Sequence, residues 1–377
     1  MRIHLDHNAG APLSAAARAA MAAALTAPGG NPSSIHAEGR AARARLERAR
    51  AVVAGLCGGP TDAAIFTSGG TEAVALGVIG HGLAARAAGS PARVLVGATE
   101  HPAVHAAAAV LAGHGFDVVT VAVDGHGRLD PADLAARLVG GAAVVALAAV
   151  NHELGVVTDL PGLAPPIRAA GARLVVDAVQ AAGRLPLPPI AALADAIALS
   201  AHKLGGPAGV GALWLRPGVE LAAIHGGGHQ ERGRRPGTEN LLGAIGFAAA
   251  VAALDDAAHR GACARAARLE AGLRAIAGVR IHGDGAPRVG TVVNAGFAGA
   301  RGDAIVIALD LAGVATSTGA ACSSGSVKPS PVLLALGLTP AAAHQAVRFS
   351  LGPGVSDADI DHVLAILPAI VARARAA

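Results

Sequence analysis

Short apolar runs alternate with longer Ala- and Leu-rich stretches from about residue 40 to residue 255. The short runs predict strands, and the longer stretches, such as 41–56 and 103–113, have the apolar spacing of helices. Strands that alternate with helices favour an α/β fold with a mainly parallel sheet covered on both faces. The six predicted strands are 64–67, 94–97, 117–121, 143–148, 173–176 and 196–199.

Beyond residue 255, helix-like stretches precede strand-like pieces around 291–294 and 347–350. This change of pattern predicts a smaller α+β domain, against which residues 1–13 are expected to pack. We therefore expect a large domain at 14–254 and a small domain made of 1–13 and 255–377. A chain of 377 residues is long enough for both, at roughly 150 residues per domain.

Composition and charge exclude several classes of protein. The 30 basic and 26 acidic residues give a net charge of +4, and aromatic residues are only 2% of the chain, so nucleic-acid binding is not predicted. The densest basic segment, 40–50, is most simply a solvated helix face. No signal peptide or membrane span is evident, so we expect a cytoplasmic protein. Three cysteines suit neither a disulfide framework nor a zinc site, and no metal is predicted.

Polar residues follow several of the predicted strands, at the edge where an open parallel sheet binds ligands. Lys203 comes just after strand 196–199, where burial would favour the neutral amine that attacks a carbonyl; the alternative is a surface lysine in a loop. The run after it, L-G-G-P-A-G-V-G, is expected to be irregular. Asp177 ends another apolar strand, and a carboxylate there needs a positive partner.

Two further strand ends carry polar groups. Gly70 and Thr71 precede a helical run, where free N–H groups and a hydroxyl suit a phosphate, although an ordinary capped helix start has the same pattern. His101 follows strand 94–97, and its alternative role is structural hydrogen bonding. Together with Lys203 and Asp177, these residues match the needs of pyridoxal 5′-phosphate: an amine, a carboxylate, phosphate donors that include Ser200 and His202, and a flat ring, His101.

The segment 316–331, T-S-T-G-A-A-C-S-S-G-S-V-K-P-S-P, surrounds Cys322 with small residues. An accessible thiol in such a setting is a candidate nucleophile, whereas Cys57 and Cys263 lie in Ala-rich helical runs and are expected to be inert. The Gly- and Arg-rich stretch 226–240 is either a solvated linker or an anion contact that a dimer partner delivers.

An ordered series of motifs covers nearly the whole chain and resembles the pyridoxal-phosphate cysteine desulfurases of the NifS/IscS kind, within the class V aminotransferase group. The resemblance implies a fold type I enzyme with a seven-stranded sheet. The motifs are Asn31-Pro-Ser-Ser-Ile-His36, Thr67-Ser-Gly-Gly-Thr-Glu72, Thr99-Glu-His-Pro-Ala-Val104, Asp177-Ala-Val-Gln180, Ser200-Ala-His-Lys203, Arg232-Gly-Arg-Arg-Pro-Gly-Thr-Glu-Asn240, Cys322-Ser-Ser-Gly325 and Val347-Arg-Phe-Ser-Leu-Gly352.

The resemblance also implies a role for each matching residue. Lys203 would bond to the cofactor's aldehyde and Cys322 would accept sulfur. His101 would stack on the ring and assist proton transfer, while Asp177 would pair with the ring nitrogen. Gln180 would contact the 3-hydroxyl of the cofactor. The phosphate would be held by Gly70, Thr71, Ser200 and His202, with Thr238 from the other subunit of a homodimer. Asn151 and Arg348 would bind the substrate carboxylate, and Asn151 would also lie near the cofactor.

The implied reaction converts L-cysteine to L-alanine and leaves a persulfide on Cys322, for transfer to an iron–sulfur scaffold or a tRNA-thiolation protein. A selenocysteine lyase, a cysteine-sulfinate desulfinase, a class V aminotransferase and a non-catalytic binding partner of the same fold remain alternatives. Two departures from the family pattern lie near the expected substrate mouth. His152 replaces a second Asn, and Ala9-Gly-Ala-Pro12 replaces a commoner Ala-Thr-Thr-Pro run.

Overall fold

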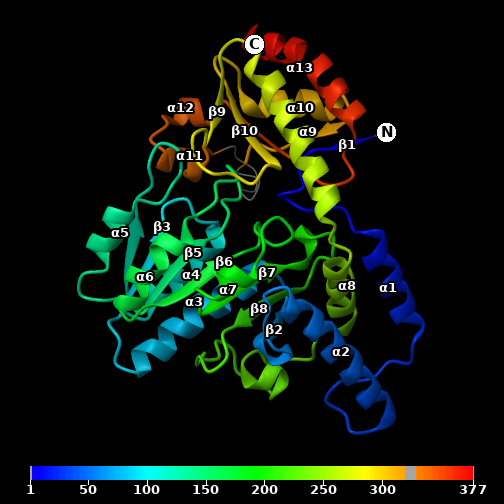
Figure 1. The fold of residues 1–377 in the computed structure, drawn as a ribbon, viewed down its shortest axis with the longest axis vertical. Helices are drawn as coiled ribbons and strands as arrows, with labels where there is room; N and C mark the ends of the chain where they lie inside the picture. The colour runs from blue at the N-terminus through cyan, green and yellow to red at the C-terminus, as the bar shows by residue number, and fades with distance from the viewer. Residues whose placement is uncertain (1, 320–327, 377) are drawn as a thin grey trace.

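A seven-stranded sheet forms the centre of the larger part of the computed structural model, which describes residues 2–319 and 328–376 (Figure 1). All six strands expected from the apolar runs are present in it, within a residue of the predicted ends. In spatial order the strands are β2 (Ala64–Thr67), β8 (Gly211–Leu215), β7 (Ala196–Ser200), β6 (Arg173–Asp177), β5 (Val144–Ala148), β3 (Arg93–Gly97) and β4 (Asp117–Val121).

Strand β8 was not predicted, and it runs antiparallel to both of its neighbours, β2 and β7. The glycines that obscured it make the reversal possible, because Gly205 and Gly209 have φ values of +77° and +78°, which other residues rarely adopt. The chain turns back directly after Lys203, and Gly211 pairs with Ser200. The other pairs in this sheet are parallel, so the α/β fold with a mainly parallel sheet is confirmed.

Alternate strand residues feed two separate hydrophobic cores, one on each face of the sheet. In β6, Leu174 and Val176 join one core, whereas Val175 joins the other. The core of Val175 is covered by α3 (Gly70–Ala87) and α4 (Pro102–Gly113). The opposite core is covered by α2 (Ala37–Gly55), α5 (Pro131–Arg137), α6 (Leu160–Ala169), α7 (Pro188–Ala191) and α8 (Leu241–Ala252), and α1 (Ala15–Thr26) packs on α8.

A second sheet, antiparallel and three-stranded, lies with its own core in the upper part of Figure 1. Its order is β12 (Ala346–Ser350), β10 (Val292–Phe297) and β9 (Val279–His282), and Arg348 pairs with Asn294. The helices near it are α9 (Asp256–Arg274), α10 (Gly302–Leu311), α11 (Pro331–Ala335), α12 (Pro340–Ala343) and α13 (Asp357–Ala376).

The N-terminal strand β1 (Ile3–His4) lies beside this second sheet and pairs in parallel with β11 (Val314–Ala315). Asp6 then bridges to Ser350 at the end of β12. Residues 2–6 therefore contact elements from the other end of the chain. The division into domains at residues 13/14 and 254/255 stays a prediction.

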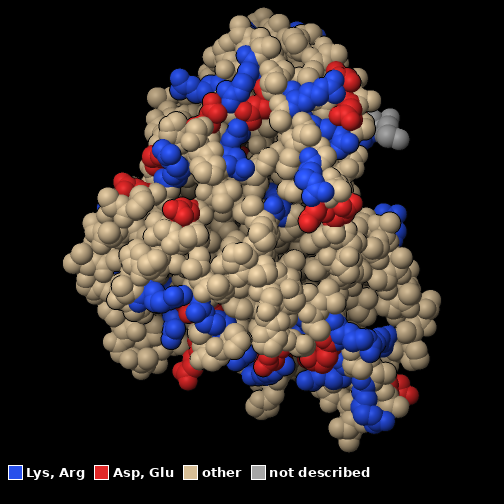
Figure 2. All heavy atoms as spheres, viewed as in Figure 1, with Lys and Arg blue, Asp and Glu red and all other residues tan. Residues whose placement is uncertain are grey.

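Basic and acidic side chains are mixed on the face drawn in Figure 2, above and below a band of uncharged surface. Within the described residues, no single helix is long and apolar enough to cross a membrane, and only the bent pair α8 and α9 has the required length and composition. The same residues contain no cluster of three or more His, Cys, Asp or Glu side chains suited to a metal ion.

Candidate functional site

The ends of three neighbouring strands, β5, β6 and β7, meet at one edge of the large sheet. Asp177 ends β6 and pairs with Ala148 of β5 on one side and Ala198 of β7 on the other. Lys203 follows β7 as the last residue of a short 3₁₀ turn, Ala201–Lys203. The sheet thus brings the predicted lysine and the predicted carboxylate to the same edge, where parallel sheets bind their ligands.

The Lys203 ammonium donates hydrogen bonds to two backbone carbonyls of the N-terminal segment. Its Nζ lies 2.6 Å from the Asn8 oxygen and 2.9 Å from the Ala9 oxygen. Its charge opposes the rise in the pKa of Asp177 and adds to the burial that lowers the pKa of His101 and of His202, so these side chains share one electrostatic environment. Lys203 is therefore held at the centre of the predicted site.

The Asp177 carboxyl has a pKa raised to about 6, because burial disfavours its charged form. The N–H of Val179, 2.9 Å from Oδ1, and the charge of Lys203 oppose that rise. A carboxylate with few internal partners in such a place is well suited to a positively charged N–H group of a ligand.

His101 caps the first turn of α4, and its Nδ1 accepts the N–H of Ala103 at 3.1 Å. Because Nδ1 is an acceptor, the neutral ring carries its proton on Nε2. Burial, together with the nearby charge of Lys203, lowers the pKa of His101, so the ring is neutral at pH 7. Its centroid lies 5.1 Å from that of His152, with the two rings inclined at 72°.

The predicted phosphate donors surround the N-terminus of α3. Gly70 is its first residue, and a Cβ there would lie 2.9 Å from Val179 Cγ2 and 3.1 Å from Ser200 Cβ. Glycine therefore lets the helix begin directly against the ends of β6 and β7. Ser200 Oγ lies 2.9 Å from Nδ1 of His202, and burial lowers the pKa of His202 to about 4. Hydroxyl, imidazole and helix N–H groups form an anion-binding donor set.

Arg348 reaches the site from β12 and is only 3% exposed. Its Nη2 donates to Asp6 Oδ1 at 2.7 Å and its Nη1 to the His152 carbonyl at 3.1 Å. The Nε has no hydrogen-bond partner within residues 2–319 and 328–376. A buried guanidinium with an unused N–H is suited to a carboxylate ligand.

The amide of Asn151 is largely committed to the protein. Its Oδ1 accepts the N–H groups of Glu153 and Leu154, both at 2.9 Å, and its Nδ2 donates to the Thr99 carbonyl at 2.8 Å. One amide hydrogen is left for a ligand, so the side chain can donate there but its oxygen is occupied.

His152, one of the two departures from the family pattern, lies between the elements of the site. Burial holds the pKa of its imidazole well below 6.5, and the positive charges of Arg348 and Lys203 add to this effect. The ring is therefore neutral, and its Nε2 lies 3.7 Å from Glu153 Oε1. The second departure lies beside His202, whose carbonyl accepts the N–H of Ala11 at 2.9 Å.

Thr238 is exposed in its own chain, in a hollow of about 460 Å³ beside the first turn of α3. Arg235 Nε, in the same loop, donates to Glu72 Oε1 at 2.7 Å. The loop is also fixed by the buried pair of Arg50 and Glu231, with Nη2 2.8 Å from Oε1. A rigid, polar loop is therefore presented at the surface near the phosphate donors.

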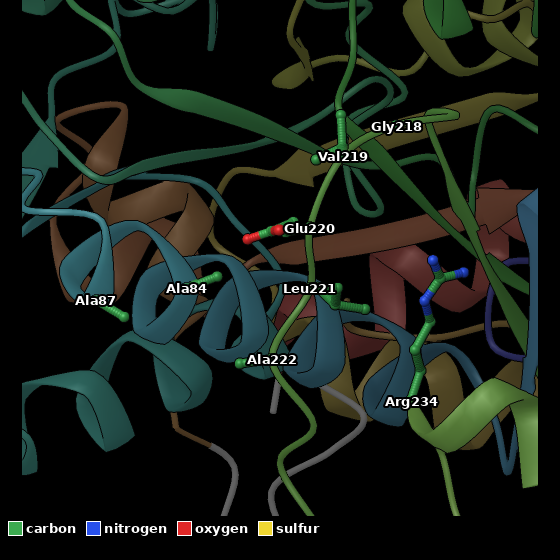
Figure 3. Close-up of a pocket in the computed structure, with 8 residues that line it drawn as sticks. All are labelled: Ala84, Ala87, Gly218, Val219, Glu220, Leu221, Ala222 and Arg234. Carbon is green, nitrogen blue, oxygen red and sulfur yellow. The ribbon is translucent and has the colours of Figure 1, made fainter. Parts of the chain in front are cut away.

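Cys322, the predicted nucleophile, lies outside the described residues. The other two cysteines have the properties expected of unreactive thiols. Burial raises the pKa of Cys57 to about 12, and it also raises that of Cys263. A further hollow, of about 520 Å³, lies between α3 and residues 218–222, and Arg234 also lines it (Figure 3). Of the side chains drawn there, only Glu220 and Arg234 are charged.

Sequence reasoning missed two buried polar residues of this region. Asn8 accepts hydrogen bonds from Lys203 and Gln180, and Glu153 accepts one from Ser330. Their position in the sequence could have indicated that they belong to the site. Each lies in a polar run that directly follows an apolar residue: Asp6-His7-Asn8 and Asn151-His152-Glu153.

Comparisons with known proteins agree with this geometry. Residues 3–363 match the sequence model of the class-V aminotransferase family. A cysteine desulfurase of Cereibacter sphaeroides is 41% identical, over 100% of this chain and 97% of its own length. A solved NifS-like protein, 26% identical, covers 99% of this chain and 100% of its own with a TM-score of 0.90. The solved structure of SspA in complex with cysteine is 25% identical. It covers 94% of this chain and 99% of its own, with a TM-score of 0.82.

Proposed function

The chain belongs to the class-V aminotransferase family, and we propose that within it the protein is a cysteine desulfurase. Such an enzyme takes sulfur from L-cysteine and releases L-alanine. The observation that carries this proposal is that Lys203 and Asp177 lie at one edge of the large sheet and that Arg348, from β12, bonds to the His152 carbonyl beside it, in a chain that is 41% identical to a cysteine desulfurase over its whole length.

The family depends on pyridoxal 5′-phosphate, and the side chains of the site fit this cofactor. The amine of Lys203 would bond to its aldehyde, and Asp177 would accept the proton-bearing ring nitrogen. His101 would lie against the ring, and Gln180 would contact the 3-hydroxyl. The phosphate would be held by Gly70, Thr71, Ser200 and His202. The unused Nε of Arg348 leaves a donor for a substrate carboxylate, with Asn151 beside it.

When bound, the cofactor withdraws electrons from the bonds at the substrate Cα. The residues of the chain supply the remaining needs of the reaction. Arg348 and Asn151 orient the substrate through its carboxylate, Asp177 keeps the ring nitrogen protonated, and Lys203 or the neutral His101 moves the Cα proton. Burial keeps the imidazoles of His101 and His152 neutral, so neither ring adds positive charge to the site at neutral pH.

Cys322 would attack the substrate sulfur as a thiolate. A sulfur–sulfur bond forms while the carbon–sulfur bond breaks, and the carbon keeps the electron pair and takes up a proton. The products are a persulfide on Cys322 and L-alanine. We assign the terminal sulfur to an acceptor protein, an iron–sulfur scaffold or a tRNA-thiolation protein, and the reaction to the cytoplasm.

A homodimer is part of this proposal, with Thr238 contributed to the phosphate site of the second copy. Its support is the exposed position of Thr238 on a loop fixed by Arg235 and Glu72, next to the helix that starts at Gly70.

Replacement of Cys322 by Ala tests the proposal. The variant should keep the visible absorption of the bound cofactor and lose sulfide release from L-cysteine, while Cys263→Ala, the matched control, keeps both. Mass spectrometry of the wild-type protein after incubation with L-cysteine should find one added sulfur on Cys322. Full sulfide release by Cys322→Ala would contradict the proposal, and turnover of selenocysteine or cysteine sulfinate by that variant would favour one of those reactions.

A further inference from the structure

Asn8 is a buried residue, 2% exposed, whose polar groups are all bonded at the edge where the site lies. Its backbone oxygen accepts from Lys203 and Gln180, and its backbone N–H donates to Ser350. Its side chain accepts from Arg184 and donates to the His152 carbonyl. A small polar side chain that is bonded at both its oxygen and its nitrogen in this way has one fixed orientation.

The backbone oxygen of Asn8 is shared by two donors that the proposed reaction uses. Lys203 Nζ lies 2.6 Å away and Gln180 Nε2 lies 3.1 Å away, so both lone pairs of the oxygen are engaged. The neighbouring carbonyl, of Ala9, accepts the same ammonium at 2.9 Å. Bonds from a charged donor are the stronger kind, so this peptide determines where the amine rests.

The side chain of Asn8 fixes that peptide in two directions. Arg184 Nη2 donates to Oδ1 at 2.7 Å, and Arg184 Nη1 donates to Gln180 Oε1 at 2.8 Å. Together with the bond from Gln180 to the Asn8 oxygen, these contacts close a ring of three residues. On the other side, Nδ2 donates to the His152 carbonyl at 2.9 Å, which also accepts Arg348 Nη1 at 3.1 Å.

The backbone N–H of Asn8 connects the same peptide to β12. It donates to Ser350 Oγ at 3.0 Å, two residues along the strand from Arg348. Asn8 therefore joins the strand that carries the proposed substrate-binding arginine to the turn that carries the lysine. A shift of either one is transmitted to the other through this residue.

We propose that Asn8 is a positioning residue of the reaction: the carbonyls of Asn8 and Ala9 receive the Lys203 amine whenever it is not bonded to the cofactor, and the Asn8 side chain keeps them in register with Gln180 and with Arg348. This inference rests on the proposed role of Lys203. The N-terminal segment would then take part in every catalytic cycle, because the Lys203 amine must leave the Asn8 and Ala9 carbonyls and return to them.

The titratable and charged groups around this place come from every element that packs on it. They are Asp177 at the end of β6, His101 before α4, His152 after β5, His202 in the turn after β7, Arg184 after β6, His7 beside Asn8 itself, and the pair of Arg348 and Asp6.

Two substitutions of Asn8 in the holoenzyme test the inference. In Asn8→Ala the peptide loses both side-chain bonds, and kcat with L-cysteine should fall about tenfold, with KM changed less than kcat. In Asn8→Asp a carboxylate is placed near Lys203, and the pH midpoint of the visible absorption of the bound cofactor should rise by about half a unit or more, because a negative charge favours the protonated form. Asn8→Ala should not raise it.

Ser14→Ala is the matched control, since it removes one side-chain bond of the same N-terminal segment, from Ala17 N to Ser14 Oγ at 3.1 Å, at the cap of α1. It should lower thermal stability and leave kcat and the absorption midpoint unchanged. If both Asn8 variants keep the kcat and midpoint of the wild type, the inference is wrong. A wild-type enzyme that makes no alanine from L-cysteine would instead overturn the proposed function. Should Asn8→Ala fail to fold, the absorption midpoint of Asn8→Asp decides alone.

Discussion

Ser330 donates a hydrogen bond from Oγ to Glu153 Oε2 over 2.7 Å, and both side chains are 2% exposed. The same oxygen lies so close to Gly319 that a Cβ there would approach it to 2.5 Å, and Gly319 has a φ of +89°. One carboxyl group thus contacts the chain both before and after the segment that contains Cys322. Glu153 follows His152 directly, so this carboxyl group links that part of the chain to Gly319 and to Ser330.

Glu153→Ala should lower the free energy of unfolding by about 1 to 3 kcal/mol, because the Ser330 hydroxyl would lose its acceptor in a buried place. Glu153→Gln keeps an oxygen acceptor and should lose less. Urea denaturation of the two variants measures the difference. Equal losses would mean that packing, and not the hydrogen bond, stabilises this region.

Glu100 should make the stability depend on pH. Burial raises the pKa of its carboxyl from 4.5 to about 8, and its Oε2 has no partner in the described part of the chain. The pKa of Glu100 is higher in the folded protein than in the unfolded chain. Its protonated carboxyl therefore contributes fully to the free energy of unfolding below pH 4.5, and this contribution is lost as the pH rises to about 8. Glu100→Gln, neutral throughout, should gain about 2 to 4 kcal/mol relative to wild type over this range. Glu38→Gln, at an exposed position, should show no such gain in the same unfolding series.

Asp177→Asn should reduce desulfurase activity by about 100-fold or more, since the ring nitrogen would lose its charged partner. Bound cofactor should remain, because Lys203 and the phosphate donors are unchanged. Asp195→Asn is the control: Asp195 accepts the N–H of Leu174, near the start of the same strand, at 2.8 Å. Steady-state rates that fall equally in both variants would assign Asp177 to the stability of β6 alone.

Arg348→Lys should raise KM for L-cysteine by about tenfold or more, with a smaller change in kcat, because an ammonium cannot replace the paired N–H groups of a guanidinium. Arg301→Lys, at an exposed pair with Asp303, should leave both constants unchanged. A fall in kcat without a change in KM would place Arg348 in the reacting step and not in substrate binding.

Much of the sheet, and the placement of Lys203 and Asp177 at one edge of it, could be predicted because the relevant signals are local. Strands such as β5 and β7 are continuous apolar runs, since both of their faces are buried. Lys203 and Asp177 each come directly after such a run, and the carboxyl ends of parallel strands share one edge. Strand β8 was missed because its signal, four apolar residues after Gly211, follows glycines and a proline that indicate a turn.

The parts that could not be predicted depend on partners far away in the sequence. Nothing near Asn8 indicates that its oxygen meets Lys203, 195 residues later, and nothing near Ser330 indicates Glu153, 177 residues earlier. Their side chains are small and polar, and that composition is equally typical of exposed turns. Only the folded structure distinguishes a buried, hydrogen-bonded position from an exposed turn.

The bonds from Asn8 to Ser350 and from Arg348 to Asp6 each span 342 residues. During synthesis, Lys203 and Asp177 therefore leave the ribosome long before β12, the strand that carries Arg348. Closing so long a span costs chain entropy and makes it a late event in folding. A truncated or stalled polypeptide that lacks β12 would carry Lys203 and Asp177 without Arg348, the residue that we propose to bind the substrate carboxylate.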